Sequence, residues 1–266
     1  MLQPYLVRGL KAGLVAGVAF GLFVAILANP MIAAAEGLAG EHGYHGEDGH
    51  AGDDQGGHHD AGGAQAGESG LLSALSPPLL SVLGGVFWAL LLGVVTFGLA
   101  FYFLEPAIPG TGAGKSAVAG ATGFVTVSGA PWLVFPPQPP GVEAALSIDA
   151  RMGLYAGLML AGLCACLLAG YWYDRLRDRG RGRAIAGAAV PFTLLVGLTF
   201  VLPANPGTGA LPAAFVAAFR AQVLFGQVVL WTLLAGTHAW LSRRASGPAA
   251  DRPAETVRRD APSAAD

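Results

Sequence analysis

The chain has 266 residues, of which 53% are hydrophobic and only 12% are charged, and its formal net charge is −2. A soluble domain usually carries about 25% charged residues, so this composition excludes an ordinary soluble globular protein, and we expect no nucleic-acid partner. The sequence also contains 40 glycines. Small residues let helices approach closely in lipid. We therefore expect an all-α integral membrane protein, embedded in a lipid bilayer, with tightly packed helices.

Apolar runs long enough to cross a bilayer, about 20 residues each, divide the chain into helical segments. Five runs are clear, and they cover residues 6–28, 79–104, 152–173, 184–202 and 215–241. A further run, residues 116–135, is rich in Gly, Ser and Thr and ends in a proline cluster, so it is either a full span or a broken one. The sequence thus predicts about six transmembrane helices in a polytopic domain of residues 1–244.

Basic residues predict the orientation of these helices. With six spans, every one of the 15 lysines and arginines except Arg151 and Arg220 lies on one side, including an Arg-rich loop at residues 174–183. The positive-inside rule makes that side cytoplasmic. Both termini are therefore predicted to be cytoplasmic, and we expect a multi-pass protein of the prokaryotic cytoplasmic (inner) membrane.

Both ends of the chain have features of their own. "MIAAAEG" at residues 31–37 resembles a signal-peptide cleavage site, but the apolar run before it is longer than a usual signal core. We expect a retained helix, with cleavage of residues 1–35 as the alternative. Residues 245–266 consist mainly of Ala, Pro, Arg and Asp without periodicity, which predicts a disordered cytoplasmic tail.

A loop rich in histidine and acidic residues, residues 36–70, is predicted to lie outside the membrane. Its core reads "EHGYHGEDGHAGDDQGGHHD", and its irregular spacing indicates a flexible segment rather than a rigid structural site. Imidazole suits Zn, Ni, Co and Cu, and carboxylates add oxygen ligands. A loop of this kind would capture metal ions loosely, although a polar low-complexity linker is the alternative. The candidate ligands are His42, His45, His50, Asp53, Asp54, His58, His59 and Asp60.

Polar residues on the last apolar run share one helix face. Arg220, Gln227 and His238 are separated by 7 and 11 residues, which at 100° per residue places them within about 20° of one line. Polar groups inside a membrane are costly and often functional. This stripe either lines an ion path or fixes packing through interhelical hydrogen bonds, with Arg220 reaching the outer surface.

A Pro-rich external segment, residues 131–150, begins "PWLVFPPQPPGVE". Its prolines prevent helix formation and free backbone carbonyls, so the segment either lines water or protein at the membrane or forms a stiff external loop. Gln138, Glu143 and Arg151 are candidates for the mouth of a pathway, together with Glu36 beyond the first span. Asn29 and Pro30 predict a turn that ends the first helix, and Asn205 and Pro206 predict the same after the fifth.

"PGTGAGKS" at residues 109–116 is similar to a phosphate-binding loop, but Pro109 stands where the motif requires glycine, and the segment joins two membrane helices. We therefore expect no nucleotide cofactor. The sequence also lacks HExxH and a set of Ser, His and Asp within the membrane that could form a catalytic triad. These observations argue against an enzyme.

Several segments together resemble the CbtA family of predicted cobalt transporter subunits. They are "NPMIAAAEGL", "FPPQPPGVE" with Arg151 and Tyr155 after it, and "LPANPGTGALPAAFVAAFRAQVLFGQVVLW" with Arg220, Gln227 and Trp231. The resemblance implies a cytoplasmic-membrane protein that supplies cobalt for cobalamin synthesis. It also implies a small single-span partner of the CbtB type.

The sequence as a whole predicts uptake of a divalent transition metal, with Co²⁺ as the first choice and Ni²⁺ or Zn²⁺ as alternatives. The histidine loop would capture the ion, and the stripe of the last helix would line its path. Inward movement needs no ATPase, because the membrane potential contributes about 2.3 kcal/mol per charge per 100 mV. The alternative is a metal-binding scaffold or sensor subunit that does not itself transport.

Overall fold

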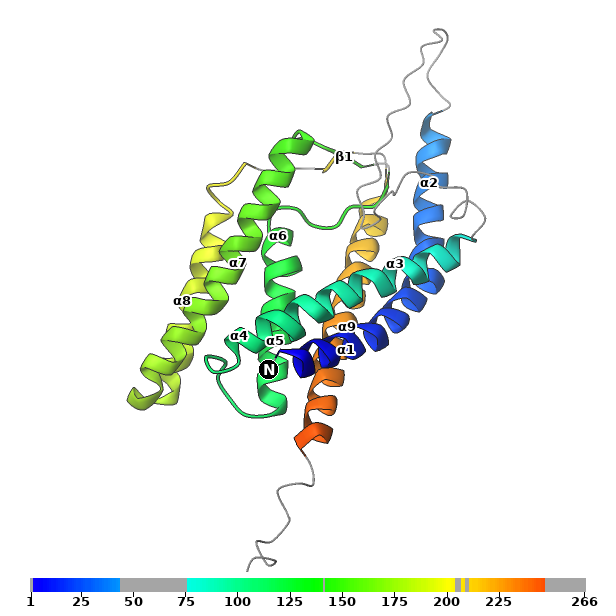
Figure 1. Ribbon diagram of the computed structural model, residues 1–266. Helices are drawn as coiled ribbons and strands as arrows, with labels where there is room; N and C mark the ends of the chain where they lie inside the picture. Colours follow the sequence, from blue (N-terminus) through cyan, green and yellow to red (C-terminus); the bar gives the residue numbers. More distant parts are fainter. Residues whose placement is uncertain (1, 44–75, 141, 204–206, 209–210, 247–266) are drawn as a thin grey trace, which may run out of the picture.

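The computed structural model describes residues 2–43, 76–140, 142–203, 207–208 and 211–246. Over these residues the regular secondary structure is helical apart from one two-stranded antiparallel ribbon, which confirms the all-α class (Figure 1). The elements in chain order are α1 (Gln3–Phe23), η1 (Val24–Ala28), α2 (Asn29–Gly43), α3 (Pro77–Leu92), η2 (Gly93–Ala100), α4 (Phe101–Leu104), α5 (Ala113–Phe124), η3 (Val125–Gly129), α6 (Ala130–Trp132), β1 (Glu143–Ala144), α7 (Ile148–Leu176), η4 (Arg177–Arg179), α8 (Arg181–Leu198), β2 (Gly207–Thr208) and α9 (Ala213–Ser246).

Within the described residues, five helices are long and apolar enough to cross a membrane, and they correspond to the five clear runs of the sequence. They are Gln3–Leu38, Pro78–Leu104, Ile148–Arg179, Arg181–Leu198 and Ala213–Ala245. The doubtful run forms one continuous helix, α5–η3–α6, from Ala113 to Trp132. This helix lies among the others, in contact with α9 through α5 and with α7 through η3 and α6.

The first helix continues through Asn29 and Pro30 to Gly43, so the prediction of a turn at these residues is wrong. Pro30 lacks an N–H, and its ring would clash with the carbonyl of Ile26 in a regular α-helix. The π-helical stretch η1 widens the turn before the proline, since the N–H of Asn29 bonds the carbonyl of Val24, five residues back. Residues 36–43 of the predicted loop are therefore helical, whereas Asn205 and Pro206 lie outside the described residues.

Helices α1 and α3 pack with their backbones in contact. The glycines of α1 recur every fourth residue and are Gly9, Gly13, Gly17 and Gly21. A Cβ added to Gly13 would lie 2.6 Å from the carbonyl oxygen of Ala89, and one added to Gly17 would lie 2.7 Å from Cα of Val86. Spacing of this kind removes side chains from the contact and brings two membrane helices together.

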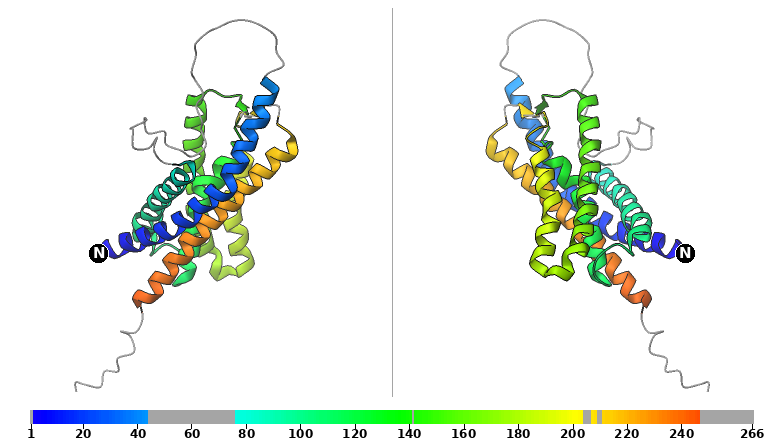
Figure 2. Two further views of the ribbon diagram at one scale, coloured as in Figure 1. Left: turned by 90° about the vertical axis from the view of Figure 1, so that its right-hand side faces the viewer. Right: turned by 90° about the vertical axis from the view of Figure 1, so that its left-hand side faces the viewer.

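Two groups of buried residues hold the helices. The larger group joins α1, α3, η2, α4, α5 and α9 and includes Phe97, Phe101, Trp231 and Leu234. The smaller group joins α6, α7 and α8 through Ala130, Ala165 and Leu195. Helices α7 and α8 form an antiparallel hairpin on one side of the bundle, and α5–η3–α6 lies between this hairpin and α9 (Figures 1 and 2).

Opposite ends of the bundle differ in charge. The connection between α7 and α8 and the end of α9 lie at one end, whereas α2 and the start of α7 lie at the other (Figure 2). Near the start of α1, Arg8 hydrogen-bonds Ser242 near the end of α9, so the start of the first helix and the end of the last meet. Lys115 and the arginines of residues 175–183 belong to this same end, which we call the basic end.

Candidate functional site

The polar stripe of α9 faces one element, the helix α5–η3–α6 and its Pro-rich continuation. Arg220 donates from Nε to the carbonyl of Pro137 at 3.2 Å. Gln227 accepts through Oε1 from the hydroxyl of Ser128 at 3.3 Å. His238 contacts the hydroxyl of Ser116 through Nδ1 at 2.9 Å. These three contacts run in antiparallel order along the two helices, and we call the surface that they share the α9 seam.

The α9 seam also contains buried nitrogen atoms without a hydrogen-bond partner among the described residues. His238 is fully buried against the rings of Phe97 and Phe101, whose centroids lie 5.0 and 4.7 Å from the imidazole. Its Nε2 lacks a partner in this part of the chain, as does Nε1 of the buried Trp231. Most buried polar atoms in proteins have a hydrogen-bond partner, and a bound water molecule or ion is one way in which such a nitrogen gains one. Two nitrogen atoms of the α9 seam are therefore available to bind a polar ligand.

Two roles are open to His238 because of its contact with Ser116. If Nδ1 carries the proton and donates a hydrogen bond to the serine hydroxyl, the Nε2 of the neutral ring has a lone pair and is able to bind a metal ion. If the serine donates to Nδ1, Nε2 carries the proton and acts as a donor instead. Only the first arrangement makes His238 a metal ligand.

Carbonyls freed by the prolines are bonded by side chains. Pro131 lacks the N–H that would bond the carbonyl of Val127 in an α-helix, and the hydroxyl of Tyr155 donates to that carbonyl instead at 3.0 Å. The carbonyl of Pro137 is bonded by Arg220. After Trp132 the chain leaves the helical conformation, as its prolines predict. Tyr155 therefore fixes η3 against α7, and Arg220 fixes the Pro-rich segment against α9.

A cavity of about 440 Å³, which we call the Pro-rich cavity, opens at the end of the bundle opposite the basic end. It is lined by Leu133, Val134, Pro136, Gln138, Thr199, Phe200, Leu202, Pro203, Gly207 and Arg220. The side chain of Gln138 packs against Gly207, where a Cβ would clash with it. The structure thus brings Gln138, which was predicted for a pathway mouth, together with Arg220 of the polar stripe.

Of the other predicted mouth residues, Arg151 and Glu36 are not among the described residues that line this cavity. Glu143 belongs to β1 and pairs with Thr208 of β2. Arg151 lies in the first turn of α7 and is half-buried, and Glu36 is exposed on α2. Glu143 and Arg151 thus belong to elements at the end of the bundle where α7 begins, and their role at a pathway mouth stays a prediction.

A second cavity, of about 480 Å³, lies at the basic end, and we call it the basic cavity. It is lined by Arg8, Phe101, Glu105, Gly112, Lys115, Ser116, Ser242 and Arg243. The hydroxyl of Tyr5 donates to the carboxylate of Glu105 at 2.5 Å, and Nζ of Lys115 donates to the backbone carbonyl of Glu105 at 2.7 Å. Because Ser116 also contacts His238, this cavity meets one end of the α9 seam.

Sequence reasoning did not identify the basic cavity. Its residues come from α1, the end of α4, α5 and α9, which are far apart in the sequence. One signal was present, since Lys115 and Ser116 end the "PGTGAGKS" segment that fails as a nucleotide motif. Their position beside Arg8 follows only from the packing of the helices.

The predicted metal ligands of the histidine loop fall largely outside the described residues. Only His42 belongs to a described element, at the end of α2. The remaining seven lie beyond the described ranges, and they are His45, His50, Asp53, Asp54, His58, His59 and Asp60. Elsewhere, the described residues contain no group of three or more His, Cys, Asp or Glu side chains that could hold a metal ion.

Residues 2–243 match the family described as "Probable cobalt transporter subunit (CbtA)". The match extends over most of the chain, so the chain belongs to this family. It is a multi-pass membrane protein of a transporter family rather than of an enzyme family. Neither the curated proteins nor the solved structures contain a significant match.

Proposed function

We propose that this member of the CbtA family takes up Co²⁺ across the cytoplasmic membrane of a prokaryote, with the ion passing along the α9 seam. The choice of cobalt and the transport role rest on membership in this family. The observation that carries the route is the position of the α9 seam, which runs from the Pro-rich cavity at Arg220 to the basic cavity at Ser116. In this proposal α5–η3–α6 is the sixth span, and the basic end with both termini faces the cytoplasm.

The proposed route begins at the external loop and then follows α9 to the basic cavity. Residues 36–70 would collect the ion outside through His and Asp side chains. The ion would then enter the Pro-rich cavity, where Gln138 offers a carbonyl oxygen, and pass the Ser128–Gln227 contact. Nε2 of His238 would be the last ligand before the basic cavity, with Ser116 holding the ring in the tautomer that can bind a metal. Glu105 supplies the carboxylate at the exit.

Weak binding along the seam suits movement of an ion better than its storage. An ion must bind strongly enough to enter a path and weakly enough to leave it. The described residues bring no three strong metal ligands together, so the seam offers single ligands and water in succession. A charge of +2 would gain about 4.6 kcal/mol per 100 mV of inside-negative potential, at about 2.3 kcal/mol for each charge.

A second candidate function follows from the contact between Gln227 and Ser128. Their side chains bond each other on the α9 seam, so an ion would pass only if this contact opened. The chain would then be a metal-binding scaffold or sensor that needs a partner, such as a small single-span subunit of the CbtB type, for transport. Family membership as a "subunit" is compatible with this reading.

Uptake of radiolabelled Co²⁺ tests the proposed route, with Ni²⁺ and Zn²⁺ as competitors, in cells without other cobalt importers. His238→Asn is the sharpest variant, because its amide replaces Nδ1 in the contact with Ser116 and removes Nε2. We expect it to lower uptake by about tenfold or more, which corresponds to roughly 1.4 kcal/mol in the barrier. Gln227→Ala is expected to act in the same direction.

Thr232→Ala is the matched control, since Thr232 is an exposed polar residue of the same helix. Deletion of residues 41–60 should weaken the apparent affinity and leave transport at high Co²⁺ intact. Unchanged uptake in both His238→Asn and Gln227→Ala, with normal amounts of protein in the membrane, would refute the route along the α9 seam.

A further inference from the structure

The basic cavity has an excess of positive charge. The described residues of its lining include the three cations Arg8, Lys115 and Arg243 but only one carboxylate, Glu105. None of these three cations forms an ion pair with another described residue. Asp174, for example, pairs with Arg177 instead. A dication leaving the α9 seam would therefore meet net repulsion here, unless an anion occupies the cavity.

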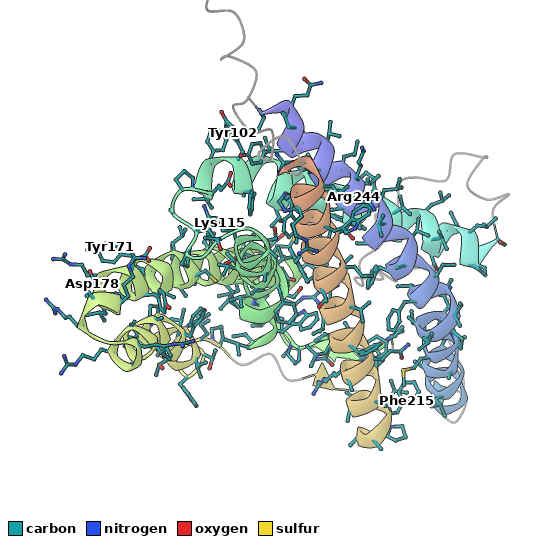
Figure 3. The ribbon with its side chains drawn as sticks, turned by 90° about the horizontal axis from the view of Figure 1, so that it is seen from below. Tyr102, Lys115, Tyr171, Asp178, Phe215 and Arg244 are labelled. Atoms are coloured by element: carbon teal, nitrogen blue, oxygen red, sulfur yellow. The ribbon has the colours of Figure 1, made fainter. Side chains whose placement is uncertain are left out.

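No other described carboxylate lines the basic cavity and offsets its positive charge. Figure 3 shows the basic end from below, with Lys115 and Arg244 toward the middle of the view and Asp178 of the α7–α8 connection at its edge. The carboxylate of Glu105 accepts a hydrogen bond from the hydroxyl of Tyr5. The excess charge of the cavity is thus left to a ligand or to solvent.

The cations of the cavity retain hydrogen-bond donors. Arg8 uses Nε for the carbonyl of Pro4 and Nη1 for Ser242, and its guanidinium lies 4.6 Å from the centroid of the Tyr5 ring. A guanidinium has five N–H donors and an ammonium has three. Lys115 uses one of its three for the carbonyl of Glu105. Arg8 and Lys115 are both held in place and both keep unused N–H donors. Together they suit a ligand that carries several acceptor oxygens.

The local backbone adds to the positive potential. Helix α5 begins at the cavity, and its first residue follows Gly112, which has φ of +49° and provides no side-chain cap. The first N–H groups of a helix and its dipole favour an anion. Ser116, one turn into the helix, also lines the cavity and supplies a hydroxyl. Cationic side chains, a helix start and a hydroxyl thus converge on one volume.

We propose that the basic cavity binds a phosphate group, carried by an anionic phospholipid or present as free phosphate. Phosphate suits these donors because it offers several oxygens and a charge that offsets the excess of the cavity. Basic pockets between membrane helices are also suited to anionic lipid head groups. The ligand would join α1, α5 and α9 at the basic end and neutralise the exit of the α9 seam. This site goes beyond the proposed transport, and it requires no metal to be occupied.

Binding to the purified full-length chain, without metal, tests this proposal. Native mass spectrometry would count the lipids retained after exchange into phosphatidylglycerol or phosphatidylcholine, and a separate titration would use inorganic phosphate. The double variant Arg8→Gln, Lys115→Gln removes two cavity cations. We expect its affinity for phosphatidylglycerol to fall by roughly 30-fold.

The matched control is Lys11→Gln, Arg244→Gln, which removes two exposed basic residues from the same ends of α1 and α9 without touching the cavity lining. It should bind like the unaltered chain. Arg8→Lys, Lys115→Arg retains the charge and should retain most of the affinity, which separates loss of the site from misfolding. Selective loss of phosphatidylglycerol binding in the cavity variant supports a lipid, and selective loss of phosphate binding supports free phosphate. Equal losses in the cavity and control variants, or no binding of either probe by the unaltered chain, would overturn the proposal.

Discussion

The contact between α1 and α3 makes a sharp prediction about two neighbouring glycines. A Cβ on Gly85 would lie 2.7 Å from Cα of Gly21 and 2.9 Å from its nitrogen, whereas a Cβ on Gly84 would meet no atom within 4 Å. Ordinary contact of a Cβ begins at 3.4 Å, so Gly85→Ala requires α1 to retreat by about 0.7 Å, the difference between 3.4 and 2.7 Å. Because both neighbours are backbone, no side chain is able to move aside.

We expect Gly85→Ala to be less stable than Gly84→Ala by about 1–3 kcal/mol, the usual cost of overpacking a core. Each variant gains a similar helix propensity, up to about 1 kcal/mol, so their difference isolates the contact with α1. The assay is unfolding of the purified proteins in mixed micelles with increasing SDS, followed by far-ultraviolet circular dichroism. Equal free energies of unfolding, or a lower value for Gly84→Ala, would show that α1 and α3 do not cross at these glycines.

Two further predictions concern the packing around α5–η3–α6. Gly123→Ala should lower the free energy of unfolding by about 1–3 kcal/mol, because its Cβ would clash with the indole of Trp231, and Gly170→Ala, which meets nothing within 4 Å, should not. The same unfolding assay checks both, and equal effects would contradict the packing. Tyr155→Phe should cost about 0.5–1.5 kcal/mol by removing the donor to the carbonyl of Val127, and an unchanged stability would mean that the bond is absent in the membrane.

Apolar length was sufficient to predict the five clear spans, because a bilayer imposes one requirement on every crossing helix. The common face of Arg220, Gln227 and His238 also followed from helical periodicity alone. Their partners could not be predicted in this way. Ser128 and Ser116 belong to a helix about a hundred residues away, and the pairing depends on how α9 packs against it.

The failure at Asn29 and Pro30 has a local cause. Proline usually ends or kinks a helix, but the π-helical stretch of Val24–Ala28 takes up the strain one residue before it. The same arrangement recurs where Val125–Gly129 precedes Pro131. A rule based on proline alone therefore predicts a break in both places, whereas each helix continues past its proline after a wider turn.

Charged sites that form only when distant helices pack together could not be predicted from the sequence. Arg8, Glu105 and Lys115 each suggest an interfacial residue when considered alone, and their convergence in one cavity requires α1, α4 and α5 to meet at the same end. The residues of the histidine loop show the opposite case. Their composition predicts metal capture directly, because loose binding by imidazole and carboxylate groups needs no particular fold.

The most direct test of the central claim is Co²⁺ flux into liposomes that contain only this purified chain, under an imposed inside-negative potential. The account predicts uptake that depends on the potential, is competed by Ni²⁺ or Zn²⁺, and falls by about tenfold or more with His238→Asn but not with Thr232→Ala. Metal binding by the reconstituted, folded chain without any flux would contradict it and would favour a scaffold or sensor that needs a partner to move the ion.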